Sequence, residues 1–136
     1  MYIKLYSDAA ERPQTQTSSA GILMIVNHKQ YQIKSLLAAT DNHEAEFQAC
    51  LLAFTTLTAK LTRAELATTV VNYYTDSKIV SDSLHKNYAK HYQRYVDQIH
   101  QLQAPFSLVF VNWIPEQQNK GAHQLALQAL HHSERK

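Results

Sequence analysis

Three acidic residues occupy positions from which their carboxylates could hold a metal ion. Asp8 follows the run YIKLYS, Glu46 lies within NHEAEFQAC, and Asp76 follows the apolar run TTVVNYYT. If the fold brings these carboxylates together without an equal number of buried Lys or Arg partners, they repel one another unless a cation lies among them. Ligation by oxygen atoms alone is typical of Mg²⁺ or Mn²⁺. The sequence therefore raises the hypothesis of a divalent metal site.

Each acid also has an ordinary interpretation. Glu46 begins an apolar stripe that continues at helical spacing through Cys50, Ala53 and Leu57, the kind of face that a helix turns toward a core. It is either a solvated acid favoured by the helix dipole at an exposed helix end, or a buried acid held by a cation. Asp76 is equally consistent with a cap for the following helix, and Asp8 with the start of a turn.

The elements that must position these acids follow from the apolar patterns. Strands are expected over residues 2–7, 21–27, 31–37, 68–75 and 105–114, and helices over 43–60, 77–84, 88–102 and 121–132. Residues 9–19 are expected to form a loop and 28–30 a hairpin turn, with Asp41 or Asn42 capping the first helix.

This order of elements predicts an α/β fold. Three antiparallel strands followed by two strands reached through helical crossovers give a mixed five-stranded sheet flanked by helices. In such sheets, sites gather at the carboxyl ends of neighbouring strands. Asp8, expected to end the first strand, and Asp76, expected to end the fourth, lie close together if those two strands are adjacent. A helix packed over them can then supply Glu46.

The composition is that of a globular chain. The 136 residues, 45% hydrophobic and 18% charged, indicate one domain over residues 1–136, which we expect to be monomeric. No run approaches the roughly 20 apolar residues of a membrane span. The single cysteine, Cys50, excludes an internal disulfide and favours a reducing, cytoplasmic location. The net charge of +2 permits a polyanionic partner, and the eight scattered histidines show no zinc-ligand spacing.

Four segments resemble the motifs of the ribonuclease H superfamily, specifically of ribonuclease HI. They are YSDAA, DNHEAEFQA, YTDSKIV and WIPEQQNKGAHQLALQAL, in the family's order and over nearly the whole chain. The resemblance implies a ribonuclease H-like fold and assigns metal binding to Asp8, Glu46 and Asp76. It also implies hydrolysis of the RNA strand of RNA/DNA hybrids, with two Mg²⁺ or Mn²⁺ ions bridged by the carboxylates.

The sequence departs from the family pattern at its fourth acidic position, which is His123. An imidazole suits Mn²⁺ or Zn²⁺ better than Mg²⁺, so a site completed by His123 is expected to favour Mn²⁺ over Mg²⁺. The alternative is that His123 is a surface residue without a metal role. The glycine-rich loop usual after the first strand is replaced by ERPQTQTSSAG, and the mobile histidine of many relatives has no clear counterpart.

Substrate contacts are also implied by the resemblance, through 2′-hydroxyl and phosphate groups in the minor groove of a hybrid. The residues at matching positions are Asn42, His43, Ser77 and Asn119. In HKNYAKHYQRY, Lys86, Lys90 and Arg94 have the spacing of one helical face, which either grips the DNA strand or is simply solvated. Trp113 and Tyr92 either stack on nucleotides or pack within the protein.

Two other functions are consistent with the sequence. One is a catalytically weakened ribonuclease H-like protein that binds nucleic acid, and the other is a DNA-processing nuclease of the same superfamily. The motifs match ribonuclease HI more closely than resolvases or integrases, which favours the hybrid nuclease.

Overall fold

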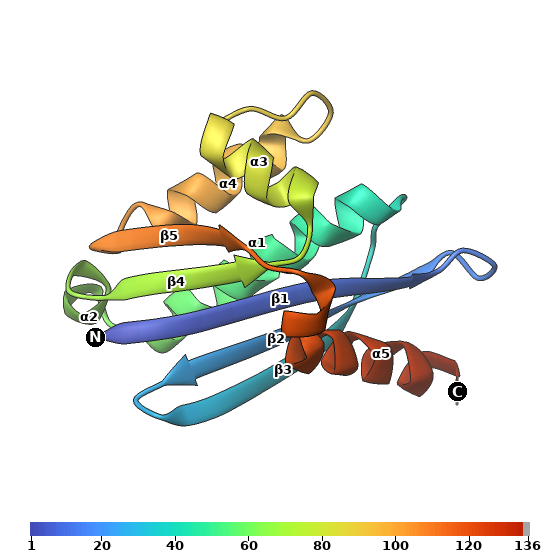
Figure 1. Ribbon diagram of the computed structural model, residues 1–136, viewed down its shortest axis with the longest axis horizontal. Coiled ribbons are helices and arrows are strands. Elements are labelled where there is room, and N and C mark those ends of the chain that lie inside the picture. Colours follow the sequence, from blue (N-terminus) through green and yellow to red (C-terminus); the bar gives the residue numbers. More distant parts are fainter. Residues whose placement is uncertain (135–136) are drawn as a thin grey trace.

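A mixed sheet of five strands forms the centre of the protein, for which a computed structural model describes residues 1–134 (Figure 1). The strands are β1 (Tyr2–Arg12), β2 (Thr17–Val26), β3 (Lys29–Leu37), β4 (Val70–Thr75) and β5 (Leu108–Trp113), in the spatial order β3-β2-β1-β4-β5. β2 pairs antiparallel with β1 and β3, whereas β4 pairs parallel with β1 and β5. The predicted sheet is confirmed, and β1 lies next to β4 as the metal hypothesis requires.

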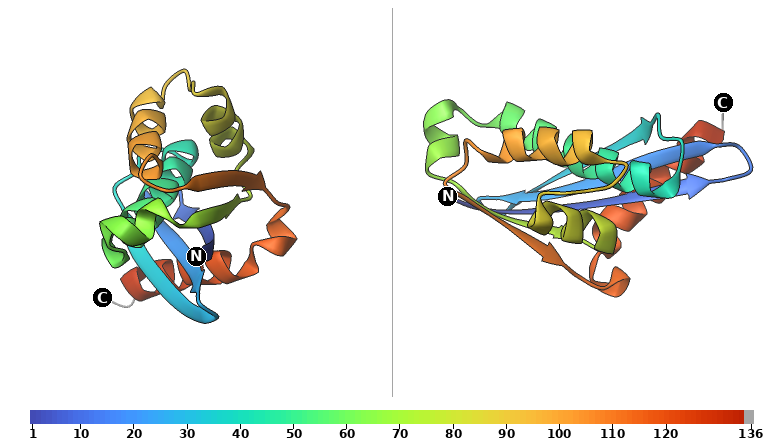
Figure 2. Two further views of the ribbon diagram at one scale, coloured as in Figure 1. Left: turned by 90° about the vertical axis from the view of Figure 1, so that its left-hand side faces the viewer. Right: turned by 90° about the horizontal axis from the view of Figure 1, so that it is seen from above.

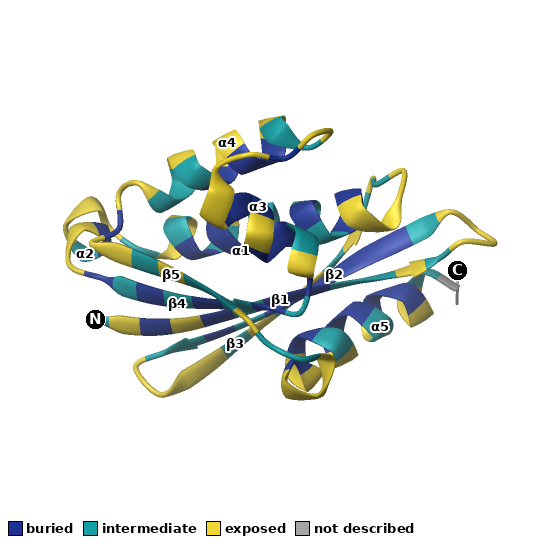
Figure 3. Ribbon diagram, turned by 45° about the horizontal axis from the view of Figure 1, so that its top comes forward, coloured by how far each residue is buried: buried dark blue, intermediate teal, exposed yellow. Residues whose placement is uncertain are grey.

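Helices cover both faces of this sheet. They are α1 (Asn42–Lys60), α2 (Arg63–Ala67), α3 (Lys78–Lys86), α4 (Gln93–Gln103) and α5 (Lys120–Glu134), with a short 3₁₀ helix at Glu116–Gln118. α1, α3 and α4 lie on one side and α5 on the other, against β1, β2 and β3 (Figure 2). The buried residues concentrate on the central strands and on the helix faces turned toward them (Figure 3). No helix within residues 1–134 has the length and apolarity needed to cross a membrane.

The β1–β2 hairpin is longer than the sequence suggested. β1 continues past Asp8 to Arg12 and β2 begins at Thr17, so the predictions of a strand ending at Asp8 and of a loop over 9–19 were wrong. The polar segment joins the ladder because it also packs: Ser18 and Ser19 are buried, and Ser19 Oγ donates a hydrogen bond to the Ala126 carbonyl of α5 at 2.6 Å. Asp8 therefore projects from the middle of a strand.

Gly21 is a packing residue for α5. A Cβ atom at this position would collide with the carbonyl oxygen of Ala122 and the amide nitrogen of Ala126. Because glycine lacks a Cβ, the first turns of α5 can approach β2 closely. This close approach sets the position of His123, which lies in the same turn of α5 as Ala122.

The segment between α3 and α4 corrects a second expectation. The helix predicted over 88–102 begins only at Gln93, because residues 87–92 form a loop. This loop starts at Asn87, whose left-handed conformation (φ 57°) ends α3. Lys86, Lys90 and Arg94 consequently lie on α3, in the connecting loop and on α4, so the prediction of one basic helical face was wrong. The short helix α2 was not predicted.

Candidate metal centre

Asp8, Glu46 and Asp76 converge at one point beside the sheet. Asp8 projects from β1, Glu46 from the first turns of α1, and Asp76 follows the last residue of β4. One carboxylate oxygen from each lies within 4.8 Å of the other two. The parallel pairing of β1 with β4 and the packing of α1 on β1 bring together residues that are up to 68 positions apart, as predicted.

None of the ordinary interpretations explains these positions. Ser77, rather than Asp76, caps α3, because its side chain accepts a hydrogen bond from the Val80 N–H. Asp8 lies within a strand and is only 5% exposed, so it does not start a turn. Glu46 is half-buried, and its Oε1 accepts a hydrogen bond from the Ala9 N–H at 2.8 Å.

The three carboxyl groups disfavour one another's ionisation. Burial, followed by the negative charges of Asp8 and Asp76, raises the pKa of Glu46 to about 9. Burial and the charge of Asp76 raise the pKa of Asp8 to about 7, although the hydrogen bond from His123 acts in the opposite direction. Burial also raises the pKa of Asp76, against the hydrogen bond that it accepts from Asn119. Such a cluster has a strong electrostatic preference for a bound cation.

His123 reaches this cluster through Asp8. Its Nδ1 lies 2.8 Å from Asp8 Oδ2, and the imidazole is the donor in this hydrogen bond when Asp8 is ionised. Within residues 1–134, His123 is the one basic side chain within ion-pair distance of any of the three acids. The predicted fourth site residue is therefore adjacent to the site, and ligation of a metal by its imidazole stays a prediction.

Asp76 is also held by hydrogen bonds from Asn119 and Trp113. Asn119 is 1% exposed, and its Nδ2 donates to the Ser7 carbonyl at 2.9 Å and to Asp76 Oδ2 at 3.4 Å. The Trp113 indole N–H donates to the Asp76 carbonyl at 3.1 Å. Of the residues predicted to contact substrate, Asn119 and Ser77 are buried. Asn42, His43, Lys86 and Lys90 lie on the surface.

Comparison with known proteins assigns this chain to a family. The model of the reverse transcriptase-like family matches residues 7–129 of the chain, which includes all four predicted site residues. The chain belongs to the ribonuclease H superfamily. It is also 37% identical over 130 residues to the Enterococcus faecalis protein named "Putative hydrolase EbsB", with 94% of this chain and 93% of that protein covered.

Solved ribonuclease H structures share the fold of this superfamily member. The TM-score is 0.82 with RNase H1 of Halobacterium salinarum, at 17% identity over 96% of this chain and 98% of that one. It is also 0.82 with the N-terminal RNase H domain of a Mycobacterium tuberculosis protein, at 16% identity over 98% and 96%. LC11-RNase H1, determined in complex with an RNA/DNA hybrid, gives 0.80 at 17% identity over 96% and 98%.

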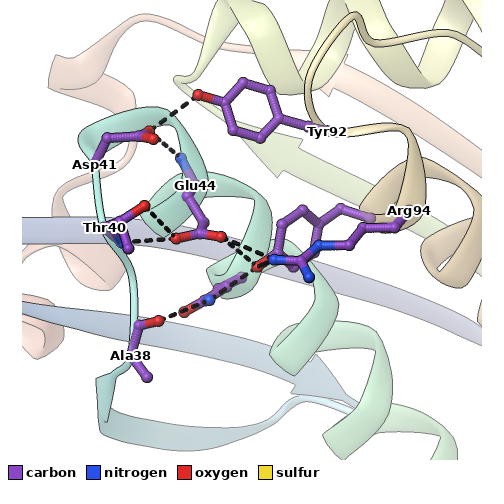
Figure 4. A network of polar contacts seen from close by, with 8 residues as sticks. Ala38, Thr40, Asp41, Glu44, Tyr92 and Arg94 are labelled. Carbon is purple, nitrogen blue, oxygen red and sulfur yellow. Dashed lines mark hydrogen bonds and ion pairs between the residues drawn. The ribbon is translucent and has the colours of Figure 1, made fainter.

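A second polar network in this ribonuclease H-like chain was not predicted (Figure 4). Glu44 Oε1 accepts hydrogen bonds from the Thr40 N–H at 2.7 Å and the Thr40 hydroxyl at 3.0 Å. Its Oε2 accepts from Arg94 at 3.0 Å and from the Tyr95 hydroxyl at 2.9 Å. Asp41 accepts from the Glu44 N–H as the helix cap, and also from the Tyr92 hydroxyl. The network joins the start of α1 to the start of α4.

This network also accounts for Arg94, which the sequence assigned to substrate binding. Its guanidinium pairs with Glu44, yet 72% of the Arg94 side chain remains exposed. One local signal for the network exists in the sequence, because Asp41 and Glu44 have the D-x-x-E spacing of a capping box. The partners on α4 are about fifty residues away and carry no such signal.

The donor set fits a hard divalent cation. The converging atoms are carboxylate oxygens, the preferred ligands of Mg²⁺ and Mn²⁺. The raised pKa values of Glu46 and Asp8 show that positive charge from the protein does not offset their burial and mutual repulsion. In a member of this superfamily, the cluster is the candidate catalytic centre.

Proposed function

We propose that this protein hydrolyses the RNA strand of RNA/DNA hybrids, using two divalent cations held by Asp8, Glu46, Asp76 and His123. The observation that carries the proposal is the convergence of three buried or half-buried carboxylates within 4.8 Å in a chain of the ribonuclease H superfamily. The chemistry supplied by bound Mg²⁺ or Mn²⁺ is activation of the attacking water and stabilisation of the leaving 3′ oxygen. The products carry 5′-phosphate and 3′-hydroxyl ends.

The residues of the chain supply placement and charge. Asp8 is fixed by its strand and by the hydrogen bond from His123, and Glu46 by the bond from the Ala9 N–H. Asn119 fixes the Asp76 carboxylate from within the protein. Because these partners hold the oxygens before any cation arrives, little reorganisation is needed at the moment of reaction.

Exposed residues at the start of α1 and at the α3–α4 connection supply the substrate contacts. Asn42 and His43 lie at the first turn of α1, where their side chains can reach 2′-hydroxyl and phosphate groups in the minor groove. Lys86 and Lys90 lie near the α3–α4 connection and attract the phosphates of the DNA strand. We expect the protein to act as a cytoplasmic monomer with weak, salt-sensitive substrate binding.

A cleavage assay tests this function. Hybrid, double-stranded RNA and double-stranded DNA of one sequence, each labelled on one strand, are incubated separately with Mg²⁺ and Mn²⁺. We expect cleavage of the RNA strand of the hybrid only, lost in Asp76→Asn. Cleavage of double-stranded DNA instead would favour a DNA-processing nuclease.

A second candidate is a nucleic-acid-binding protein with little catalysis. It is favoured by His123, which contacts Asp8 at the position where the family has its fourth acid. Absence of hybrid cleavage with either metal, together with hybrid binding that is unchanged in Asp76→Asn, would select this candidate over the enzyme.

A further inference from the structure

Trp113 is a half-exposed aromatic residue at the border of the acid cluster. It is the single tryptophan of the chain and the last residue of β5, and 51% of it is exposed. Its indole N–H donates to the carbonyl oxygen of Asp76, which fixes the ring beside the last residue of the cluster. The Lys78 ammonium lies 6.0 Å from the centroid of the indole ring.

Packing within the protein explains the other aromatic candidate but not this one. The Tyr92 ring stacks on Phe47 with centroids 5.1 Å apart, and its hydroxyl donates to Asp41. Trp113, by contrast, has its polar atom satisfied while half of the residue faces solvent. A fixed indole with an exposed apolar surface is a ready partner for another flat ring.

Lys78 supplies a positive charge beside the indole, the sign that attracts a phosphate. Its ammonium lies at the outer limit of cation–π attraction, so it interacts only weakly with the indole and can still bind an anion. Lys78 is exposed and begins α3, and so lies close in the chain to Asp76. An aromatic surface beside a free ammonium matches the two parts of a nucleotide, because bases stack on aromatic rings whatever their sequence and phosphates pair with lysine.

We propose that Trp113 and Lys78 form a nucleotide subsite next to the acid cluster. The indole packs against one nucleotide, and the Lys78 ammonium pairs with the adjoining phosphate. This inference rests on the proposed function in one respect, because both require that the protein binds nucleic acid. Two surfaces of a nucleotide fit this chemistry, namely the base of an unpaired strand and the sugar exposed in the minor groove of a duplex.

The fluorescence of the single tryptophan reports on this subsite directly. A single-stranded RNA 12-mer and a blunt 12-base-pair hybrid are titrated separately, at low salt with EDTA, so that binding is read without hydrolysis. We expect Trp113 emission to change in intensity or wavelength with at least one probe. A change with the single strand alone assigns the subsite to a base, and a change with the hybrid assigns it to the duplex surface.

Variants test the two residues separately by fluorescence anisotropy of labelled probes. Trp113→Ala is expected to weaken binding about tenfold, a typical loss for one stacked base, and Trp113→Phe to restore most of it. Lys78→Gln keeps the tryptophan fluorophore. It is expected to reduce by about one the number of counterions released on binding, which is read from the salt dependence of the affinity. The matched control is Phe110→Ala, because Phe110 is 50% exposed on the same strand but points to the opposite face of the sheet.

Two outcomes would overturn the subsite. One is unchanged Trp113 emission while anisotropy shows that either probe binds. The other is equal binding by wild type, Trp113→Ala and Lys78→Gln, with all three folded by circular dichroism. Cleavage is measured separately from binding. A protein that binds nucleic acid through Trp113 but does not cleave it would therefore contradict the proposed function and leave the subsite supported.

Discussion

Two glutamates in the first turns of α1 have opposite electrostatic environments. Glu44 accepts four hydrogen bonds, from Thr40, Arg94 and Tyr95, and these lower its pKa, with the Thr40 N–H contributing most. Glu46 accepts one hydrogen bond, from the Ala9 N–H, and its pKa is raised to about 9. Two residues correspond to about 200° around a helix, so the two side chains leave α1 in nearly opposite directions.

The difference separates a structural acid from a site acid. Glu44 is supplied with donors by its own fold, so its charge is already compensated and it has no need of a ligand. Glu46 faces two other carboxylates, and the fold supplies them with His123 as the single basic partner within residues 1–134. An acid that the fold leaves uncompensated in this way is a marker of a functional site.

The largest expected effect is that of Glu46→Gln on activity. The substitution preserves the shape of the side chain but removes a charged ligand. We expect hybrid cleavage to fall by roughly a thousandfold, because metal-ion stabilisation of the transition state is worth several kcal/mol. The measurement is single-turnover cleavage of a labelled hybrid with Mn²⁺. Glu44→Gln, the same chemical change two residues earlier, is the matched control, and an equal loss in both variants would contradict the distinction.

The pH dependence of stability is the second test. Glu46 and Asp8, with pKa values of about 9 and about 7 in the folded protein, ordinarily titrate near 4.5 and 3.8. Between these limits the folded state binds more protons than the unfolded state, so the free energy of unfolding of the metal-free protein falls as pH rises from about 4 to about 9. We expect the melting temperature in EDTA to be lower at pH 8.5 than at pH 5.5 by about 5 °C or more.

Two comparisons show whether this trend originates in the cluster. Mn²⁺ added at pH 8.5 is expected to raise the melting temperature by binding the folded state alone. Glu46→Gln is expected to flatten the pH profile, since it removes the cluster acid whose pKa is raised to about 9. A profile that is equally steep in Glu46→Gln would locate the effect elsewhere in the molecule.

Glu44→Gln tests the other half of the comparison. A glutamine side chain offers one acceptor oxygen in place of two, so donors from Thr40 or from α4 lose their partner. We expect a loss of about 1–3 kcal/mol in the free energy of unfolding, measured by urea denaturation at pH 7, with hybrid cleavage by the folded protein largely retained. Asp97→Asn is the control, because Asp97 is an exposed acid on α4 outside this network. Equal losses in both variants would argue against a structural role for Glu44.

The sequence predicted the site acids better than it predicted their surroundings. Asp8, Glu46 and Asp76 could be found because each follows or begins an apolar pattern that fixes its element. The adjacency of β1 and β4 was only a condition of the sequence-based hypothesis, and the structure supplies this pairing. The end of β1 was misplaced because burial by α5, a tertiary contact, draws the polar Ser18 and Ser19 into the ladder.

The roles of single polar residues were harder to predict. The spacing of Arg94 indicates a helical face, but its partner Glu44 lies fifty positions away, and no local pattern couples the two. Asn119 matches a family position for substrate contact, yet it is buried against Ser7 and Asp76, because the residue just before α5 lies against the middle of β1 and the end of β4. Only the folded arrangement distinguishes a polar group aimed inward from one aimed at a ligand.

His123→Asp has the smallest expected effect, and it changes the acid cluster to which Glu46 belongs. It removes the hydrogen bond to Asp8 and adds a fourth carboxylate, so the cluster gains negative charge and loses its one basic partner within residues 1–134. We expect wild type to prefer Mn²⁺ over Mg²⁺ and the variant to use Mg²⁺ about tenfold better, because Mg²⁺ prefers oxygen ligands to imidazole. The ratio of cleavage rates in the two metals measures this preference and cancels differences in protein quality.

The control for this substitution is His132→Asp, which makes the same chemical change at an exposed position near the far end of α5. It alters net charge equally but cannot change the ligands at the cluster, so its ratio of rates is expected to match wild type. Metal binding read by calorimetry separates two roles of His123. If the imidazole ligates the second cation, His123→Ala binds fewer Mn²⁺ ions than wild type. If the imidazole only orients Asp8, His123→Ala binds the same number more weakly, and the acid cluster alone defines the metal site.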